Sequence, residues 1–244
     1  PDGSSAEPPV LIAALGPRML ELAATATDGT LPLDASRFAL GDETAGGLHV
    51  LMKNIPVMDP KPVAIKGQVT GPITFGMGLK DDQGRAIYYN PNTRDAAVKL
   101  LALKAAYQIR IFEDVGCPVI IFLDEPALAG YGSSEMISIA AGEIAASLDE
   151  INDVVHTEGG LSGIHVCANT DWSMVMESQA DIVNFDAYGY FDRFILYEEN
   201  IADFFRSDRV LAWGLVPTLN PEDILREDAE SLAARFFDQV DRMA

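Results

Sequence analysis

Apolar runs of strand length alternate with longer segments of helical pattern, and this alternation constrains the fold of the chain more than any other feature. The runs are residues 62–69, 118–123, 162–166, 181–185 and 210–216. Each run is followed by a polar turn and then by a segment whose apolar residues recur at helical spacing. Strands and helices in strict alternation are typical of βα units, which build a parallel sheet. The sequence therefore predicts an α/β fold with five strand-plus-helix units after residue 60.

Capping residues predict where the helices begin and end. Asn92 or Thr93 is expected to cap a helix over residues 94–115, and Gly116 is expected to end it. Further helices are expected at residues 10–25 and 44–52, from Ser133 or Ser134 to about residue 155, after Thr170 or Asp171, at residues 196–205, and from Pro221 to the C-terminus. No strand is predicted within the first sixty residues.

Length and charge narrow the class of protein. The chain has 244 residues, which suits a single barrel domain. Its 17 basic and 37 acidic residues give a net charge of −20, a surface that repels nucleic acid and anionic membranes. Two cysteines cannot form a disulfide framework, and no apolar run approaches the length of a membrane span. We therefore expect a cytoplasmic enzyme with a small-molecule substrate.

Polar side chains gather where the predicted strands end, at Thr70, Asp124, Glu125, His165, Cys167, Asp186 and Thr218. In parallel barrels the βα loops converge at this end of the strands, and the active site lies there. The sequence therefore predicts that these scattered residues form one site. Cys117 precedes a strand at the opposite end, so we expect it to be an inert residue of the core.

His165 and Cys167 are candidate metal ligands. Residues two apart on a strand point to the same face, so an imidazole and a thiolate would project together. Zinc binds nitrogen and sulfur ligands, and Asp186 is the candidate third ligand. A thiol bound at the open position of such a zinc would lose its proton. The alternative is a half-buried His and a buried Cys that bind no metal.

Asp124 and Glu125 are the candidate catalytic residues, because adjacent acids after an apolar strand are costly unless solvated or paired. One can hold a substrate amine, and the other can transfer a proton or orient a ligand. The alternative is a structural cap at the strand end. Thr70, Asn169 and Tyr188 are the further candidates for contact with the substrate, although turn chemistry and packing also account for such residues.

Five segments together resemble a known superfamily. They are KGQVTGPITFG (66–76), FLDEPAL (122–128), GIHVCANTDWS (163–173), DIVNFDAY (181–188) and AWGLVPT (212–218). In this order they are similar to the superfamily that contains the catalytic domain of cobalamin-independent methionine synthase, the zinc-dependent corrinoid:thiol methyltransferases and uroporphyrinogen decarboxylase. The resemblance begins at about residue 60. It implies that residues 1–244 form one (β/α)8 TIM-type barrel domain.

The resemblance also implies roles for individual residues. In the methyltransferases the H-x-C pair, here His165 and Cys167, supplies zinc ligands, whereas the decarboxylases lack it. Asp186 occupies the place of a further Glu ligand of the methionine synthases, and Asp124 matches the Asp that contacts the homocysteine amino group. The family's N-terminal strand and its last zinc cysteine are not visible. We therefore expect a barrel that is incomplete at both ends.

The leading hypothesis is a zinc-dependent methyltransferase that acts on a thiol, with homocysteine as the first choice of acceptor. The folate-binding half of the long methionine synthases is not visible, so the methyl donor is expected to be a corrinoid protein or a methylfolate. Two alternatives stay open. One is a decarboxylase-like enzyme for an acidic macrocycle, which needs cationic residues at its site. The other is a corrinoid- or ligand-binding partner without turnover.

Overall fold

A computed structural model describes residues 41–134 and 136–243 of the chain. Its strands are β1 (Ile65–Thr70), β2 (Val119–Asp124), β3 (Leu161–Val166), β4 (Ile182–Phe185) and β5 (Val210–Trp213). Its α-helices are α2 (Asp42–Asn54), α3 (Pro72–Gly78), α4 (Pro91–Phe112), α5 (Ala141–Thr157), α6 (Trp172–Glu177), α7 (Ala187–Phe194), α8 (Glu198–Arg206), α9 (Pro221–Arg226) and α10 (Ala229–Met243). All five predicted strands are present. The helix predicted at residues 10–25 lies outside the described residues.

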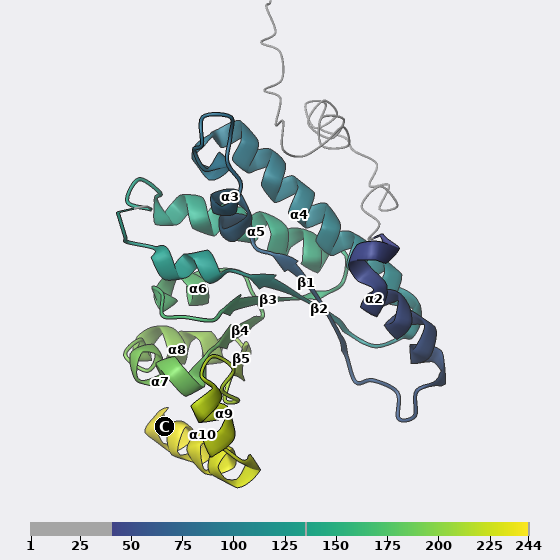
Figure 1. Cartoon of the computed structure of the whole chain (residues 1–244), viewed down its shortest axis with the longest axis vertical. Coiled ribbons are helices and arrows are strands. Elements are labelled where there is room, and N and C mark those ends of the chain that lie inside the picture. Colours follow the sequence, from purple (N-terminus) through teal and green to yellow (C-terminus); the bar gives the residue numbers. More distant parts are fainter. Residues whose placement is uncertain (1–40, 135, 244) are drawn as a thin grey trace, which may run out of the picture.

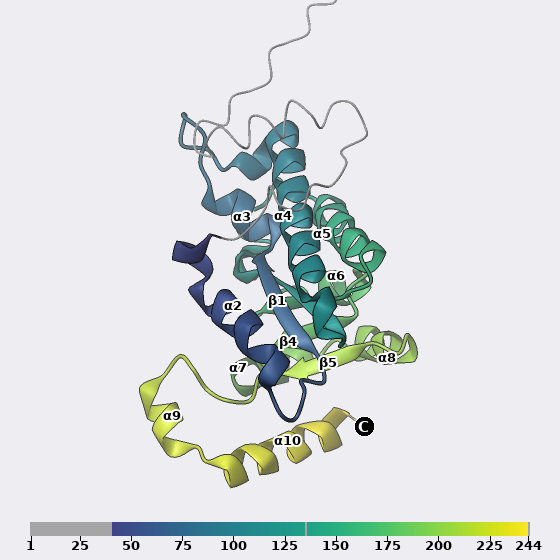
Figure 2. The same cartoon turned by 90° about the vertical axis from the view of Figure 1, so that its right-hand side faces the viewer.

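The strands form one parallel sheet whose spatial order, β1-β2-β3-β4-β5, is the order of the chain (Figure 1). Every pair of neighbouring strands is parallel. The α4 and α5 helices lie side by side along one side of β1 (Figure 2), and α9 and α10 lie at the far end of the molecule from α3 (Figure 1). The predicted α/β fold with a parallel sheet is therefore confirmed.

Alternation along the strands gives the sheet one buried face and one open face. On β2 the side chains of Val119, Ile121 and Leu123 are buried toward the helices. On β4 Phe185 packs against Trp172 of α6 and stacks on Phe194 of α7, with centroids 5.9 and 3.9 Å apart. These residues belong to one apolar core between the sheet and its helices, and such burial is the dominant stabilising contribution to a fold of this kind.

The open face carries a polar row at the carboxyl end of the sheet. The register pairs Thr70 with Asp124, Asp124 with His165, His165 with Asn184, and Asn184 with Ala212. Since side chains alternate between faces, residues paired across parallel strands share a face. The backbone pairing of the strands thus places the side chains of Thr70, Asp124, His165 and Asn184 in one line across four neighbouring strands.

The residue that caps α4 lies two positions before the first of the two predicted caps. The Asn90 side-chain oxygen accepts bonds from the backbone N–H groups of Asn92 (2.9 Å) and Thr93 (3.4 Å), so the prediction of Asn92 or Thr93 as the cap was wrong. Pro91 then occupies the first helical position, where its missing N–H costs nothing. The α-helix itself ends at Phe112, and a 3-10 turn (Glu113–Val115) continues it to Gly116, whose left-handed φ of 73° ends the helical segment as predicted.

The α5 helix begins at Ala141, so the predicted cap at Ser133 or Ser134 was wrong. Before α5 the chain instead makes successive turns, in which the N–H groups of Ser133, Met136 and Ile139 each donate to the carbonyl three residues earlier (3.0, 3.1 and 2.9 Å). These turns bury Met136 and Ile139 against the core without a continuous helix. Ser favours such turns as well as helix caps. The Glu143 carboxylate accepts a bond from the N–H of Ala140 and thereby caps α5 (3.2 Å).

The C-terminal segment is two helices instead of the single predicted one. The α9 helix has Pro221 in its first turn as expected, but it ends at Arg226. The Asp228 carboxylate accepts a bond from the N–H of Ser231 (2.8 Å) and starts α10. Two further helices, α3 and α7, lie where the sequence predicted none. None of the described helices is long and apolar enough to cross a bilayer.

Candidate active site

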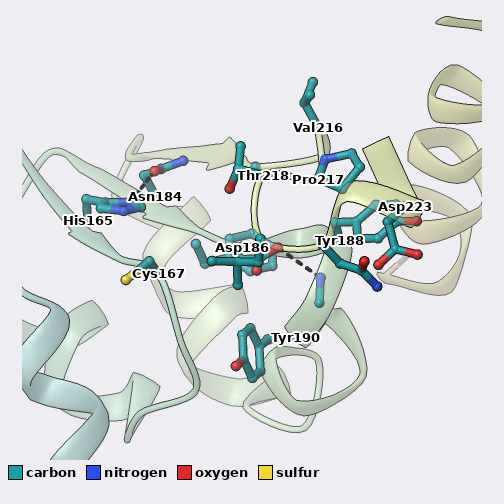
Figure 3. A pocket seen from close by; sticks show the side chains of 15 residues that line it. His165, Cys167, Asn184, Asp186, Tyr188, Tyr190, Val216, Pro217, Thr218 and Asp223 are labelled. Atoms are coloured by element: carbon teal, nitrogen blue, oxygen red, sulfur yellow. Dashed lines mark hydrogen bonds between the residues drawn. The ribbon is translucent and has the colours of Figure 1, made fainter. Parts of the chain in front are cut away.

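A cavity of about 470 Å³ opens at the carboxyl ends of β3, β4 and β5 (Figure 3). Its size is that of a pocket for a small molecule. The residues that line it include His165, Cys167, Asn184, Asp186, Tyr188 and Thr218. The structure therefore brings the three predicted metal ligands to one cavity, together with two further predicted strand-end residues, Tyr188 and Thr218.

His165 is half-buried on the open face of β3, and its ring is held by the neighbouring strand. Its Nδ1 lies 2.5 Å from Oδ1 of Asn184 on β4. The Nδ2 of Asn184 in turn donates a bond to the carbonyl of Ala212 on β5 (2.8 Å). The sequence reasoning missed Asn184. Its position two residues before Asp186, on the same face of its strand, was the available signal.

Cys167 follows β3 directly, and its side chain is exposed. It lines the same cavity as His165, as the spacing of two residues predicts. In Figure 3 its sulfur points away from Asp186. The thiol is therefore accessible to a ligand, but it does not converge with the carboxylate.

The Asp186 carboxylate caps the start of α7, the helix that follows β4. Its Oδ1 accepts a bond from the N–H of Gly189 (2.9 Å), which makes Asp186 the N-cap of α7 (Figure 3). Such a bond satisfies one of the free N–H groups at a helix start. A substitution of Gly189 would place Cβ 2.9 Å from the same carboxylate. Asp186 therefore has a structural function in this conformation.

The described part of the chain contains no group of three or more His, Cys, Asp or Glu side chains placed to hold a metal ion. A catalytic zinc takes three protein ligands and keeps one position open. His165 and Cys167 fit two of these ligand positions by chemistry and by location. The third predicted ligand, Asp186, is turned to α7. The described residues thus provide an incomplete donor set, and we derive no reaction step through a metal.

Glu125 is fully buried and joins three strand ends. Its carboxylate accepts bonds from the N–H groups of Ile73 (2.8 Å) and Thr74 (2.8 Å) and from the Thr74 hydroxyl (2.6 Å). Its own N–H donates to the carbonyl of His165 (2.8 Å). Burial raises the pKa of Glu125 to about 7, although these hydrogen bonds act in the opposite direction. The structure therefore places Glu125 behind the site, as the connection between β1, β2 and β3.

Three other predicted site residues lie outside the lining of the cavity. Thr70 and Asp124 belong to the polar row, beside His165 on the open face. Asn169 lies in the loop after β3, and its buried Oδ1 has no hydrogen-bond partner among the described residues. The row and the cavity therefore share His165 and Asn184.

Tyr188 forms the wall between the cavity and the C-terminal helices. Its hydroxyl donates a bond to Glu227 (2.7 Å) and accepts one from Arg226 (2.9 Å), while the Arg235 guanidinium lies 4.4 Å from the centre of its ring. The hydroxyl bonds of Ser231 and Tyr188 hold the pKa of Glu227 below its ordinary value. The Tyr188 ring, and not its hydroxyl, is therefore what a ligand in the cavity meets.

No Lys or Arg is among the described residues that line this cavity. Fold and cavity together define an α/β protein with a small-molecule-sized pocket at the carboxyl ends of its parallel strands. A comparison with protein-family models and with curated proteins finds no match for the chain. The geometry of the site and the pattern of the sequence therefore carry the functional argument.

Proposed function

We propose that this chain is a methyltransferase that moves a methyl group from a methylated donor to the sulfur of a small thiol, with homocysteine as the leading acceptor. The observation that carries the proposal is that His165 and Cys167 line one cavity at the carboxyl ends of the strands. An imidazole beside a thiol is the donor pair that zinc prefers. The H-x-C pair is also what distinguishes the methyltransferases of the superfamily that the sequence resembles.

We further infer that the five strands are consecutive strands of a (β/α)8 TIM-type barrel. Their spatial order equals their chain order, and each is parallel to the next. In doubly wound sheets, by contrast, the strand order reverses at a switch point. The described order contains no such reversal. The polar row on the open face then corresponds to the inner surface of the barrel.

In this proposal the residues of the chain bind and orient the substrate. The Tyr188 ring walls the pocket, and Asp124, which lies beside His165 outside the cavity lining, holds the amine of a substrate that extends from the cavity past His165. The substrate thiol gives its proton to solvent; its sulfur then forms a bond to the methyl carbon while the bond from that carbon to the donor breaks. His165 and Cys167 are the residues that would hold a zinc ion, and such an ion would favour the thiolate form of the substrate. The donor is a methylcorrinoid or a methylfolate.

The charge of the cavity favours this proposal over a decarboxylase for an acidic macrocycle. A ligand with several carboxylates needs cationic partners, because burying unpaired charge is costly. The described lining offers none, whereas Asp186 and Asp223 both border the cavity. A substrate with an amino group suits this wall better.

The proposal is tested by metal content and methyl transfer in the full chain, with His165→Ala and Cys167→Ser as site variants. His156→Ala and Cys117→Ser are the matched controls, because they alter the same residue types away from the cavity. We expect about one zinc per chain in the wild type and in both controls, and its loss in both site variants. Product formation is followed by mass spectrometry with homocysteine and either methylcobalamin or methyltetrahydrofolate. Absence of zinc in the wild type contradicts the proposal.

A further inference from the structure

We propose that Asn184 is a positioning residue that holds His165 in the tautomer with the proton on Nδ1 and the lone pair on Nε2. The tautomer itself follows from the hydrogen bonds of three neighbouring strands. Only the use of the Nε2 lone pair in methyl transfer rests on the proposed function. Asn184 was not among the residues that the sequence pattern singled out.

The orientation of the Asn184 amide is the first step. One end of the amide lies 2.8 Å from the carbonyl oxygen of Ala212. A carbonyl oxygen only accepts hydrogen bonds, so the end that faces it is the NH₂ group. The amide oxygen therefore points the other way, toward β3.

The protonation of the imidazole follows from that orientation. The amide oxygen of Asn184 lies 2.5 Å from Nδ1 of His165. This oxygen also only accepts, so the hydrogen of the bond belongs to Nδ1. In the neutral ring the second nitrogen, Nε2, then carries the lone pair.

The sheet itself fixes this arrangement. His165, Asn184 and Ala212 are paired in register across β3, β4 and β5. Parallel strands lie about 4.8 Å apart, and residues in register share a face, so the three groups have a nearly fixed spacing. His165 and Asn184 are half-buried, where a hydrogen bond is stronger than in water. The tautomer is thus imposed by the backbone and not by a mobile loop.

The selected tautomer differs from the one that free histidine favours in water, where the proton resides mainly on Nε2. A neutral imidazole binds a metal or accepts a proton only through the nitrogen that carries the lone pair. Asn184 therefore makes Nε2 the reactive nitrogen of His165. Nδ1 itself is occupied by its hydrogen bond to Asn184 on the adjacent strand.

The test is the tautomer of His165 in ¹⁵N-histidine-labelled, metal-free full chain, measured by long-range ¹H–¹⁵N correlation at a pH at which the ring is neutral. The chain has three histidines, and His165→Gln identifies the resonances of His165 by their disappearance. We expect a protonated Nδ1 and an unprotonated Nε2 in the wild type. Asn184→Leu removes the acceptor and should shift the ring toward the Nε2-protonated form. Asn184→Asp keeps an acceptor and should retain the wild-type pattern.

The wild-type spectrum alone decides the proposal if Asn184→Leu fails to fold. A wild-type His165 with its proton on Nε2 overturns it, and so does an Asn184→Leu protein that folds with an unchanged tautomer. Ile182→Val, on the same face of β4, is the control for a general effect of altering that strand, and its His165 resonances should not change. If the wild type contained no zinc, the methyltransferase proposal would fail, but the measured tautomer of His165 would be unaffected. The failure of one proposal can therefore be distinguished from the failure of the other.

Discussion

Replacing Glu125 with Gln should change how the stability of the protein depends on pH. The carboxyl group is fully buried, and its pKa is raised from the ordinary 4.5 to about 7. Between these two values the folded protein holds a proton that the unfolded chain has released. The contribution of this proton to stability is therefore complete below pH 4.5 and is lost as the pH rises through 7. Since one pKa unit corresponds to about 1.4 kcal/mol, the loss amounts to about 3 kcal/mol.

The Gln side chain does not titrate, but it replaces one accepting oxygen by a donor. Three groups donate to the two oxygens of Glu125 at 2.6–2.8 Å. The best fit of Gln turns its NH₂ toward Ile73 and leaves that buried N–H without an acceptor, at a cost of about 1–3 kcal/mol. We therefore expect Glu125→Gln to be less stable than the wild type at pH 5. The difference should vanish or reverse above pH 8.

The assay is urea unfolding followed by circular dichroism at a series of pH values from 5 to 9. All other carboxyl groups contribute equally to both proteins, so the difference between the two curves isolates Glu125. Glu199→Gln, at an exposed position of α8, controls for the loss of one negative charge. Parallel curves for the wild type and Glu125→Gln would refute the reasoning, because they would show that the buried carboxyl does not titrate in this range.

Three further substitutions test the packing around the site. Gly71→Ala would place Cβ 2.3 Å from the Glu125 carboxyl and should lower the free energy of unfolding in urea by about 1–3 kcal/mol. Gly78→Ala is the control, because a Cβ there meets nothing within 4 Å, and it should lower that free energy by less than half as much. Gln239→Leu should destabilise the fold by about 1–3 kcal/mol and alter Trp213 fluorescence, because the Gln239 amide bonds both the Trp213 indole and the Ala187 carbonyl (2.8 Å each). An unchanged emission spectrum would contradict that contact. Tyr188→Phe should speed amide exchange in residues 221–231 while leaving α4 protected, because the Tyr188 hydroxyl connects α7 to Glu227 and Arg226.

The strands were predictable because each is a short apolar run bounded by turn residues, a pattern that is visible in the sequence. Helix ends were less so, because Ser and Asn serve turns and caps alike: Ser133 lies in a turn, and Asn90, not Asn92, caps α4. The sequence also does not show which use an acid has. Asp186 has the placement of a ligand and the bonds of a helix cap, and the helix that it caps, α7, is one of two that the sequence did not predict.

The candidate site was predictable as far as it depends on strand ends. His165 and Cys167 reach one cavity because two residues of a strand share a face, which is a local rule. The contribution of Asn184 depends on which residue lies opposite His165 on the next strand. That register is a tertiary property, so the sequence could place Asn184 on the same face as Asp186 but could not show that it lies opposite His165. The role of Glu125 was also not predictable from the sequence, since only the fold shows that the first turn of α3 donates hydrogen bonds to its carboxylate.

The outer edge of β1 has a consequence for how the sheet can grow. The Gln108 side chain of α4 accepts a bond from the N–H of Gln68 (3.1 Å) and donates one to its carbonyl (2.9 Å). Gly67 is required there, because a Cβ would lie 2.4 Å from the Gln108 oxygen. A single buried amide thus imitates a neighbouring strand in the middle of this edge, where free backbone groups would otherwise invite pairing with another strand. Any strand that paired with β1 at Gln68 would have to replace both hydrogen bonds from Gln108, so this point of the edge resists further growth of the sheet.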